Sequence, residues 1–197
     1  MSDQGGAFCP CDGPRLFQGE ILSELIERRP RWRGKLPDGE DDMGFDGVHH
    51  PYAVVLTQDC DLEQDARERE LPPDQRKRPG ALLEHVLLVL ADAWDRQRST
   101  LAGSDIAKQA RQNKIERYQY LSAVPTDRDA LGQGVPALLL DLKRVFTVPL
   151  GELLGAIERK ETFRRARLIT PYAEHLASRY GYFAMRVPLP VDHHNLG

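Results

Sequence analysis

The sequence predicts an α+β domain that is mainly β. Residues 52–56 form a short apolar run rich in β-branched side chains, which fits a strand buried on both faces. Residues 86–90 form a second run of this kind. Signals for helix starts are fewer and occur at Ser104, Pro149 and Thr170-Pro171. We therefore expect a small sheet with an inserted helix and C-terminal helices.

The length of 197 residues fits one domain with elaborations. We expect this domain at residues 14–190, a flexible N-terminal arm at 1–13 and a tail at 191–197. The net charge of −3 gives no overall attraction to nucleic acid, so any such binding must be local. No apolar run reaches the ~18 residues that span a bilayer, and the N-terminus lacks the marks of a signal peptide. The expectation is a cytoplasmic protein with no membrane partner, whose three cysteines stay thiols.

The first half of the chain is expected to alternate strands with charged segments. Residues 19–27 fit a helical stripe or a strand, and we favour a strand. Residues 63–80 are highly charged, contain Pro72-Pro73 and predict a long loop. Residues 86–90 predict an interior strand, although a buried helix fits the same run. Ser104 would then N-cap an inserted helix that reaches Lys114.

The second half predicts three more strands and two helices. Residues 118–121 form a short aromatic strand candidate, and residues 137–142 and 145–148 predict two strands joined at Lys143-Arg144. Pro149 precedes a helix at 151–158. The last helix begins after Thr170-Pro171, and its face of Leu176, Tyr180 and Phe183 should dock on the sheet.

A basic segment with one aromatic residue is the candidate nucleic-acid contact. Arginines and lysine can neutralise phosphates, and a tryptophan can stack on a base. In the alternative interpretation the segment is a solvated loop, neutralised by the acidic residues 38–42 that follow it. The candidate contacts are Arg28, Arg29, Arg31, Trp32, Arg33 and Lys35.

The row Asp59-Cys60-Asp61 follows the central strand and is the second candidate site. Neighbouring carboxylates oppose thiolate formation, so we expect Cys60 to be structural, at or near the end of a buried strand, and its replacement by Ala to cost about 1 kcal/mol or more. A Cys-His nucleophile, a zinc site and a magnesium site at the two aspartates remain alternatives, but no metal or cofactor is assigned. The histidines and cysteines considered with Cys60 are His49, His50, His85, Cys9 and Cys11.

Three short motifs resemble the PemK/MazF family of toxin-like small barrels. They are Gly19-Glu20-Ile21, Pro51 followed by Val54-Val55-Leu56, and Leu140-Asp141-Leu142 before Val145. The resemblance implies an SH3-like barrel with a terminal helix, commonly dimeric, and in the toxins a metal-independent endoribonuclease. The chain departs from the family at His50-Pro51, where the toxins resemble one another in an Arg-Pro, and at Ala91-Asp92-Ala93, where they carry a Thr or Ser.

These patterns support three hypotheses of function. The leading one is a non-catalytic or weakly catalytic module that binds nucleic acid, preferably RNA, through the basic segment. The second is a metal-independent endoribonuclease in which His50 acts as acid or base near Asp59 and Cys60. The third is a regulatory module that binds a protein partner through residues 63–80. The resemblance adds a homodimer as an expected state.

Overall fold

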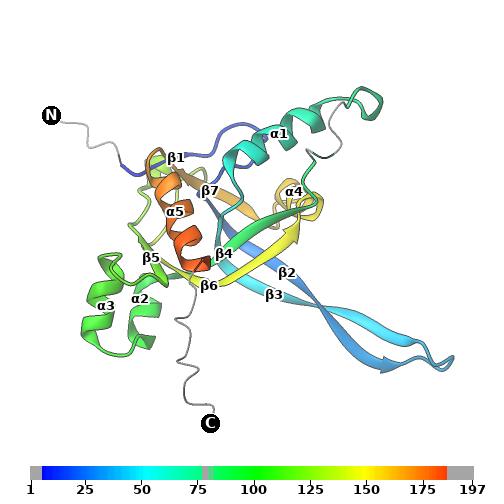
Figure 1. The fold of residues 1–197 in the computed structure, drawn as a ribbon, viewed down its shortest axis with the longest axis horizontal. Coiled ribbons are helices and arrows are strands. Elements are labelled where there is room, and N and C mark those ends of the chain that lie inside the picture. Colours follow the sequence, from blue (N-terminus) through cyan, green and yellow to red (C-terminus); the bar gives the residue numbers. More distant parts are fainter. Residues whose placement is uncertain (1–5, 77–79, 81, 186–197) are drawn as a thin grey trace, which may run out of the picture.

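The computed structural model describes residues 6–76, 80 and 82–185. These residues form an α+β fold that is mainly β (Figure 1). A seven-stranded sheet runs in the order β1-β7-β2-β3-β4-β6-β5, and every neighbouring pair is antiparallel. The strands are β1 (Phe8–Pro10), β2 (Glu20–Lys35), β3 (Asp41–Val55), β4 (His85–Ala93), β5 (Tyr118–Leu121), β6 (Leu138–Pro149) and β7 (Phe163–Leu168).

Five α-helices and three short 3-10 turns join and cover these strands in the described residues. The helices are α1 (Asp59–Glu70), α2 (Trp94–Gln97), α3 (Ser104–Arg111), α4 (Leu150–Glu158) and α5 (Tyr172–Ala184). The turns are η1 (Pro73–Gln75), η3 (Arg98–Thr100) and η4 (Thr126–Arg128). No helix in the described part of the chain is both long and apolar enough to cross a membrane.

The expected closed barrel is not observed in the described residues. The terminal strands β1 and β5 each pair with one neighbour and not with each other. A small apolar cluster at β5 contains Trp94, Ala110 and Leu139 and packs with Tyr118 and Tyr120, so α2 and α3 cover this end of the sheet. A closed SH3-like barrel would need the edge strand at this end of the sheet to pair with a strand from the other end.

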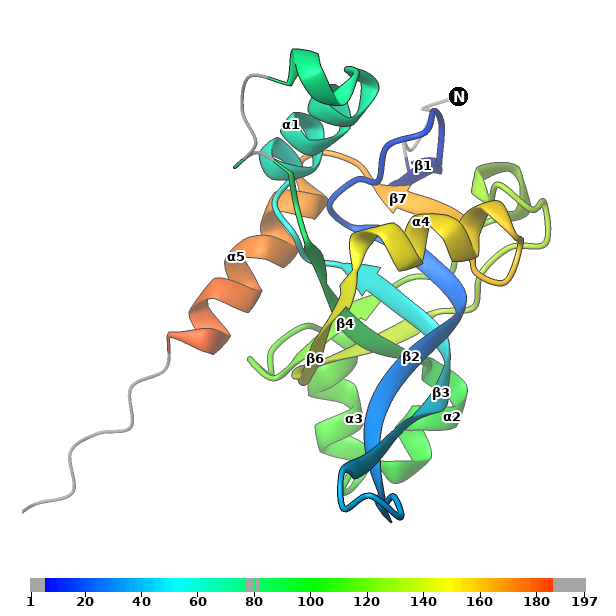
Figure 2. The same cartoon turned by 90° about the vertical axis from the view of Figure 1, so that its right-hand side faces the viewer.

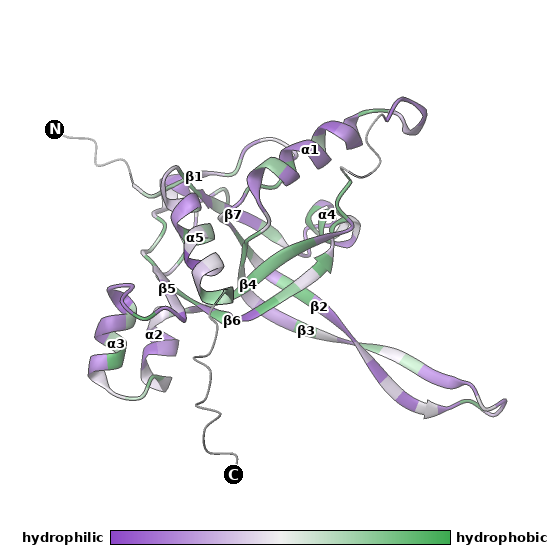
Figure 3. Cartoon of the chain, viewed as in Figure 1, coloured by the Kyte–Doolittle hydropathy of each residue, from purple (hydrophilic) through white to green (hydrophobic). Residues whose placement is uncertain are grey.

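Two apolar clusters lie on opposite faces of the sheet. Neighbouring residues of one strand alternate between them: Val54 belongs to the first cluster and Val55 to the second. Leu176 of α5 packs in the first cluster, while α4 contributes Leu150 and Leu153 to the second. Figure 2 shows α4 and α5 on different sides of the strands, and Figure 3 shows the hydrophobic character of β4 and β6 between them. The core is therefore built on both faces of the sheet.

Several sequence predictions are confirmed by these elements. Strands form at β2, β4 and β5, and helices form at α3, α4 and α5. The N-cap position of α3 is Gly103 rather than Ser104. Leu176 of α5 is buried against the sheet, as its helical spacing predicted.

Three expectations were wrong. Residues 8–10 of the predicted flexible arm form β1, which pairs with β7. Much of the predicted loop at 63–80 belongs to α1, where the i,i+4 pairs Glu63–Arg67 and Asp65–Arg69 stabilise a helix with little apolar surface. Lys143-Arg144 does not separate two strands but lies inside β6, next to a register shift in its pairing with β4. Residues 1–5 of the arm, the last five residues of the domain expected at 14–190 and the tail at 191–197 lie outside the described residues.

A buried ion pair connects β7 to the loop after η4. Arg165 donates from Nε and Nη2 to the two carboxylate oxygens of Asp129, at 2.9 and 2.8 Å, and both side chains are buried. Burial alone would raise the pKa of Asp129. The hydrogen bonds from Arg165 and from the backbone N–H groups of Leu131 and Gln133 outweigh it and hold this pKa below its ordinary value.

We expect Asp129→Asn to lower the free energy of unfolding at pH 7 by about 3 kcal/mol, because it leaves the Arg165 guanidinium buried without its charge partner. A carboxylate with a lowered pKa contributes stability above its unfolded pKa and loses that contribution as the pH falls through the folded value. Urea unfolding at pH 7 and pH 3 should therefore show a smaller acid loss in the variant than in the wild type. The control Asp127→Asn, whose partner Arg128 lies 3.5 Å away in an exposed pair, should change stability by less than about 0.5 kcal/mol. An equal effect of the two substitutions would contradict this account.

Candidate functional site

A two-stranded hairpin arm projects from the sheet (Figure 1). Strand β7 pairs with β2 at Glu20–Ser23, and β4 pairs with β3 at Tyr52–Val55. Beyond these points β2 and β3 continue as a ladder with each other to Lys35 and Asp41. We define the hairpin arm as residues 25–50. It contains the whole basic segment, which the alternative interpretation of the sequence had placed in a solvated loop.

The register gives the hairpin arm one apolar face. Side chains of cross-strand partners share a face and alternate along each strand, so Ile26, Pro30 and Trp32 lie with Phe45 and Met43. Ile26, Trp32, Met43 and Phe45 are 51%, 60%, 55% and 64% exposed. Arg28 shares this face, and the Trp32 indole Nε1 donates to Asp41 Oδ1 at 3.2 Å. The hairpin arm thus exposes several large apolar side chains together on one face, which is unusual for a protein surface.

The opposite face of the hairpin arm carries charges that are mostly paired. Arg29 donates to both carboxylate oxygens of Glu27, at 2.9 and 2.8 Å, and Arg31 donates to Asp46 at 3.1 Å. Neutralisation of the basic segment therefore occurs, but chiefly through Glu27 and Asp46 rather than through residues 38–42. The Arg33 side chain lies across Gly44, where an added Cβ would be 2.1 Å from its Nε.

His50 lies at the base of the hairpin arm and is buried. Its Nε2 is 2.7 Å from Glu27 Oε2, and its ring centroid is 5.2 Å from that of Phe146. Hydrogen bonds from Arg29 lower the pKa of Glu27, burial acts in the opposite direction, and the bond to His50 lowers it further. An ionised Glu27 accepts hydrogen bonds from both neighbours, which fixes the His50 ring and favours a proton on Nε2.

A polar cavity of about 340 Å³ adjoins His50. Tyr52, Asp92, Arg96 and Arg144 lie in its wall, and Arg144 donates to Asp92 at 2.8 Å. Within the described residues, the His50 ring makes its hydrogen bond through Nε2, which leaves Nδ1 as the second ring nitrogen beside the cavity. The cavity is lined by two histidines, a phenol, two guanidinium groups and the Asp92 carboxylate. Asp92 engages Arg144, whereas Arg96 makes no ion pair with a described residue and suits an anionic ligand.

Asp59 and Cys60 do not join His50. Asp59 begins α1 and accepts from Arg15 at 3.0 Å and from the backbone N–H of Gln18 at 3.3 Å. From His50 to the end of β3 at Val55 the chain advances about 16 Å at ~3.3 Å per residue, and Asp59 lies further along the chain. The structure thus separates the three predicted catalytic candidates into two places.

The expectation that Cys60 is a buried strand-end residue was wrong. Cys60 is exposed in the first turn of α1, and its sulfur is 3.7 Å from side-chain oxygens of Gln58 and Asp61. The strand ends at Val55, and the helix that starts at Asp59 turns Cys60 outward while Leu62 enters the core. No group of three or more His, Cys, Asp or Glu residues in the described chain is placed to hold a metal. His193 and His194 lie outside the described residues.

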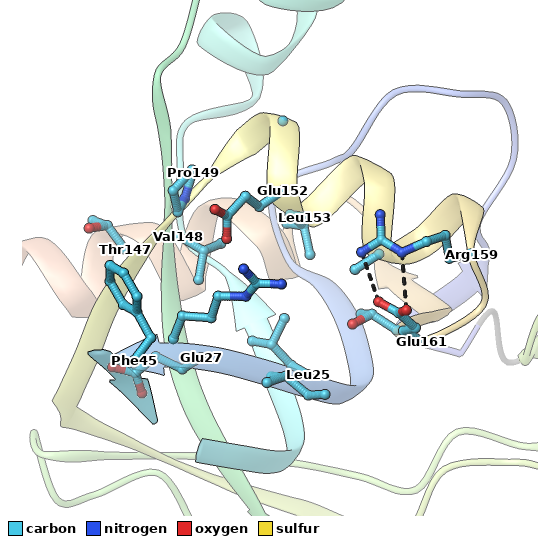
Figure 4. Close-up of a pocket in the computed structure, with 15 residues that line it drawn as sticks. Leu25, Glu27, Phe45, Thr147, Val148, Pro149, Glu152, Leu153, Arg159 and Glu161 are labelled. Carbon is cyan, nitrogen blue, oxygen red and sulfur yellow. Dashed lines mark hydrogen bonds and ion pairs between the residues drawn. The ribbon is translucent and has the colours of Figure 1, made fainter. Parts of the chain in front are cut away.

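A larger groove of about 520 Å³ runs between the base of the hairpin arm and α4 (Figure 4). Phe45 and Thr147 lie at one end of it, and the Arg159–Glu161 pair lies at the other. Leu25, Val148 and Leu153 of the second apolar cluster reach its floor. No sequence pattern indicated this groove, because its walls come from segments more than 100 residues apart.

No known protein family, curated protein or solved structure matches this chain. The site must therefore be interpreted from its own geometry. Sequence reasoning found His50 but missed Glu27 as its partner, since the two residues meet only through the β2–β3 register. The one signal in the sequence for this partner was that Glu27 is an acidic residue directly before the basic segment.

We expect Cys60 to be the most reactive thiol of the folded protein towards a thiol reagent at pH 8, because it is exposed. Cys11 should react slowly: burial first, and then the negative charge of Glu20, raise the pKa of its thiol far above the ordinary value. The rapid phase of labelling should disappear in Cys60→Ser. Cys60→Ala should change the unfolding free energy by less than about 0.5 kcal/mol. If Cys60→Ala lowered the unfolding free energy by about 1 kcal/mol or more, or if Cys60 did not react with the reagent, Cys60 would be a buried structural residue after all.

Proposed function

We propose that the protein binds single-stranded nucleic acid on the apolar face of the hairpin arm, with RNA as the preferred ligand. The observation that supports this most is the placement of Trp32 and Phe45 on one exposed face of a projecting ladder, together with Arg28. Unpaired bases stack on exposed aromatic rings, and each stacked base contributes about 1–3 kcal/mol. The motif resemblance to the PemK/MazF family favours RNA over DNA.

The charges of the hairpin arm indicate how such binding would work. Arg29 and Arg31 are already engaged by Glu27 and Asp46, so they contribute little to phosphate neutralisation. Arg28 makes no ion pair with any described residue, and Lys35 donates to the backbone oxygen of Gly39 rather than to a carboxylate. Stacking should therefore supply most of the affinity. With two phosphate contacts on a single strand, the salt slope should be about −1.4.

The test is binding of a fluorescent twelve-nucleotide oligouridylate, followed by anisotropy across a range of salt concentrations. Trp32→Ala and Phe45→Ala should each weaken binding about tenfold or more, because each removes an exposed stacking surface. Arg28→Ala should reduce the salt slope, whereas Arg29→Ala should change it less, because its guanidinium is held by Glu27.

Tyr182→Ala is the matched control, since Tyr182 is a 75% exposed aromatic residue on α5, away from the hairpin arm. It should leave the affinity unchanged. Absence of binding at low salt, or equal losses for Tyr182→Ala and Trp32→Ala, would rule out the arm as the binding surface.

A second candidate function, RNA cleavage, is favoured by the His50–Glu27 pair beside the polar cavity. If Nε2–H is donated to Glu27, Nδ1 carries the lone pair that can accept the proton of a ribose 2′-hydroxyl. The 2′-oxygen then attacks the adjacent phosphorus, and the 5′-oxygen of the next nucleotide leaves. Arg96 and Arg144 line the cavity in which the developing phosphate charge would lie.

Incubation with total RNA in the presence of a chelator tests this candidate. His50→Asn should abolish cleavage, and Glu27→Gln should slow it at least tenfold, because the amide no longer stabilises the imidazolium. Asp59→Asn should have no effect, since Asp59 belongs to the Arg15 contact. An inactive wild type, or cleavage that survives in His50→Asn, would exclude His50 chemistry and leave the binding proposal standing.

A further inference from the structure

The edge of β2 that faces away from β3 is open next to the groove. Strand β7 occupies this edge at Glu20–Ser23, and no described strand pairs with it from residue 25 onward. Four consecutive residues, 25–28, line the groove. A strand that showed a face to a cavity would contribute every second residue. The run of four therefore indicates that the strand edge, with its backbone groups, borders the groove.

Pro30 identifies which backbone groups point outward. Proline has no N–H, and within sheets it is confined to positions where the missing donor faces away from the partner strand. Pro30 is paired opposite Phe45 inside the β2–β3 ladder. Since outward-pointing groups alternate along a strand, those of Arg28 and Ile26 share the orientation of Pro30. Both residues line the groove.

The far wall of the groove is α4, which leaves room for another chain. Gly151 and Ala156 lie in this wall, and a Cβ added at Gly151 would meet no atom within 4 Å. Leu25 and Leu153, both buried, supply an apolar floor between the strand edge and the helix. Figure 4 shows α4 across the open space from β2. The space has the volume of an ordinary ligand site.

The charges along the groove favour a polypeptide over a polyanion. Arg159 donates to both carboxylate oxygens of Glu161, at 3.0 and 2.8 Å. The carboxylate of Glu27 is already hydrogen-bonded to Arg29. Arg28 and Glu152, which both line the groove, form no ion pair within the described part of the chain. The lining thus holds three carboxylates and two guanidinium groups, and Arg29 neutralises one of the carboxylates from outside the groove, so the groove has no excess of positive charge for a polyanion. A peptide backbone, with its alternating donors and acceptors, matches an open strand edge directly.

We propose that this groove binds an extended segment of a partner protein, which adds as a further strand to the edge of β2 at residues 25–29. Backbone hydrogen bonds to Ile26 and Arg28 hold the segment. Leucine or β-branched side chains at its alternate positions fill the apolar floor, and polar side chains between them face solvent. Pro30 limits the addition, because its ring offers no donor.

The probe is an acetylated and amidated eight-residue peptide of alternating valine and threonine, labelled with a fluorophore. Anisotropy should show saturable binding, and an analogue N-methylated at every second amide should bind at least tenfold more weakly, because strand addition needs those donors. At saturation, amide hydrogen exchange measured by NMR should slow at least tenfold at Ile26 and Arg28, with little change at Leu25 and Glu27.

Gly151→Leu should weaken binding of the peptide at least tenfold, because the new side chain enters the groove from α4. Gly181→Leu is the matched control: Gly181 is also a helical glycine where an added Cβ would meet nothing within 4 Å, but it lies on α5, and its replacement should leave the affinity unchanged. Circular dichroism verifies that both variants fold. The proposal is overturned by absence of binding at millimolar peptide, equal binding of the N-methylated analogue, wild-type affinity in Gly151→Leu, or unchanged exchange at Ile26 and Arg28. Self-association lost in Gly151→Leu would assign the groove to a second copy instead.

Discussion

The antiparallel ladder between β2 and β3 is the interaction on which the other features depend. It continues from the core to the hairpin tip, whereas the flanking strands leave it after Ser23 on one side and before Tyr52 on the other. An isolated two-stranded ladder is marginally stable in water. Three side-chain contacts that join the two strands support this one: Arg31 with Asp46, His50 with Glu27, and Trp32 with Asp41. The exposed aromatic face and the open edge of β2 both exist because β2 and β3 extend beyond the strands that flank them.

The point where the hairpin arm leaves the sheet has a special backbone. Leu22 and Leu25 lie in the same apolar cluster although they are three residues apart, which strict alternation along a strand does not allow. Glu24, between them, has a φ of 58°, in the left-handed region that costs a side chain of this kind about 1 kcal/mol. Thr162 donates to the Glu24 carbonyl oxygen and His49 Nε2 lies 2.6 Å from the Glu24 carboxylate. The change of side that occurs here puts Leu25, and with it Glu27 and His50, on the side of the second cluster.

The sequence predicted the core strands well and the surface elements poorly, for physical reasons. Residues 52–56 and 86–90 are buried on both faces, so their composition alone marks them as interior strands. Helix α1 has no comparable apolar stripe. It depends on i,i+4 ion pairs and on Asp65, which accepts the backbone N–H of Leu83 from 18 residues away. Lys143-Arg144 resembled a turn, but Arg144 pairs with Asp92 of the adjacent strand, a contact that local sequence does not show.

The candidate site was predictable only in part, because the pairing register of β2 and β3 decides which of its residues meet. The basic segment and His50 could be found by residue type, and Cys60 was misplaced because the turn after β3 could not be foreseen. The partner of His50 could not be found this way: Glu27 is 23 residues away, and a shift of one residue in the ladder would place it on the other face of the arm. The same register brings Arg29 to Glu27, so a single carboxylate both neutralises the basic segment and orients the histidine. Charge pairing on one face thereby leaves stacking, backbone pairing and the unpaired Arg28 as the interactions still open on the hairpin arm. For this reason an electrostatic interpretation of the basic segment does not by itself describe what the arm offers to a partner.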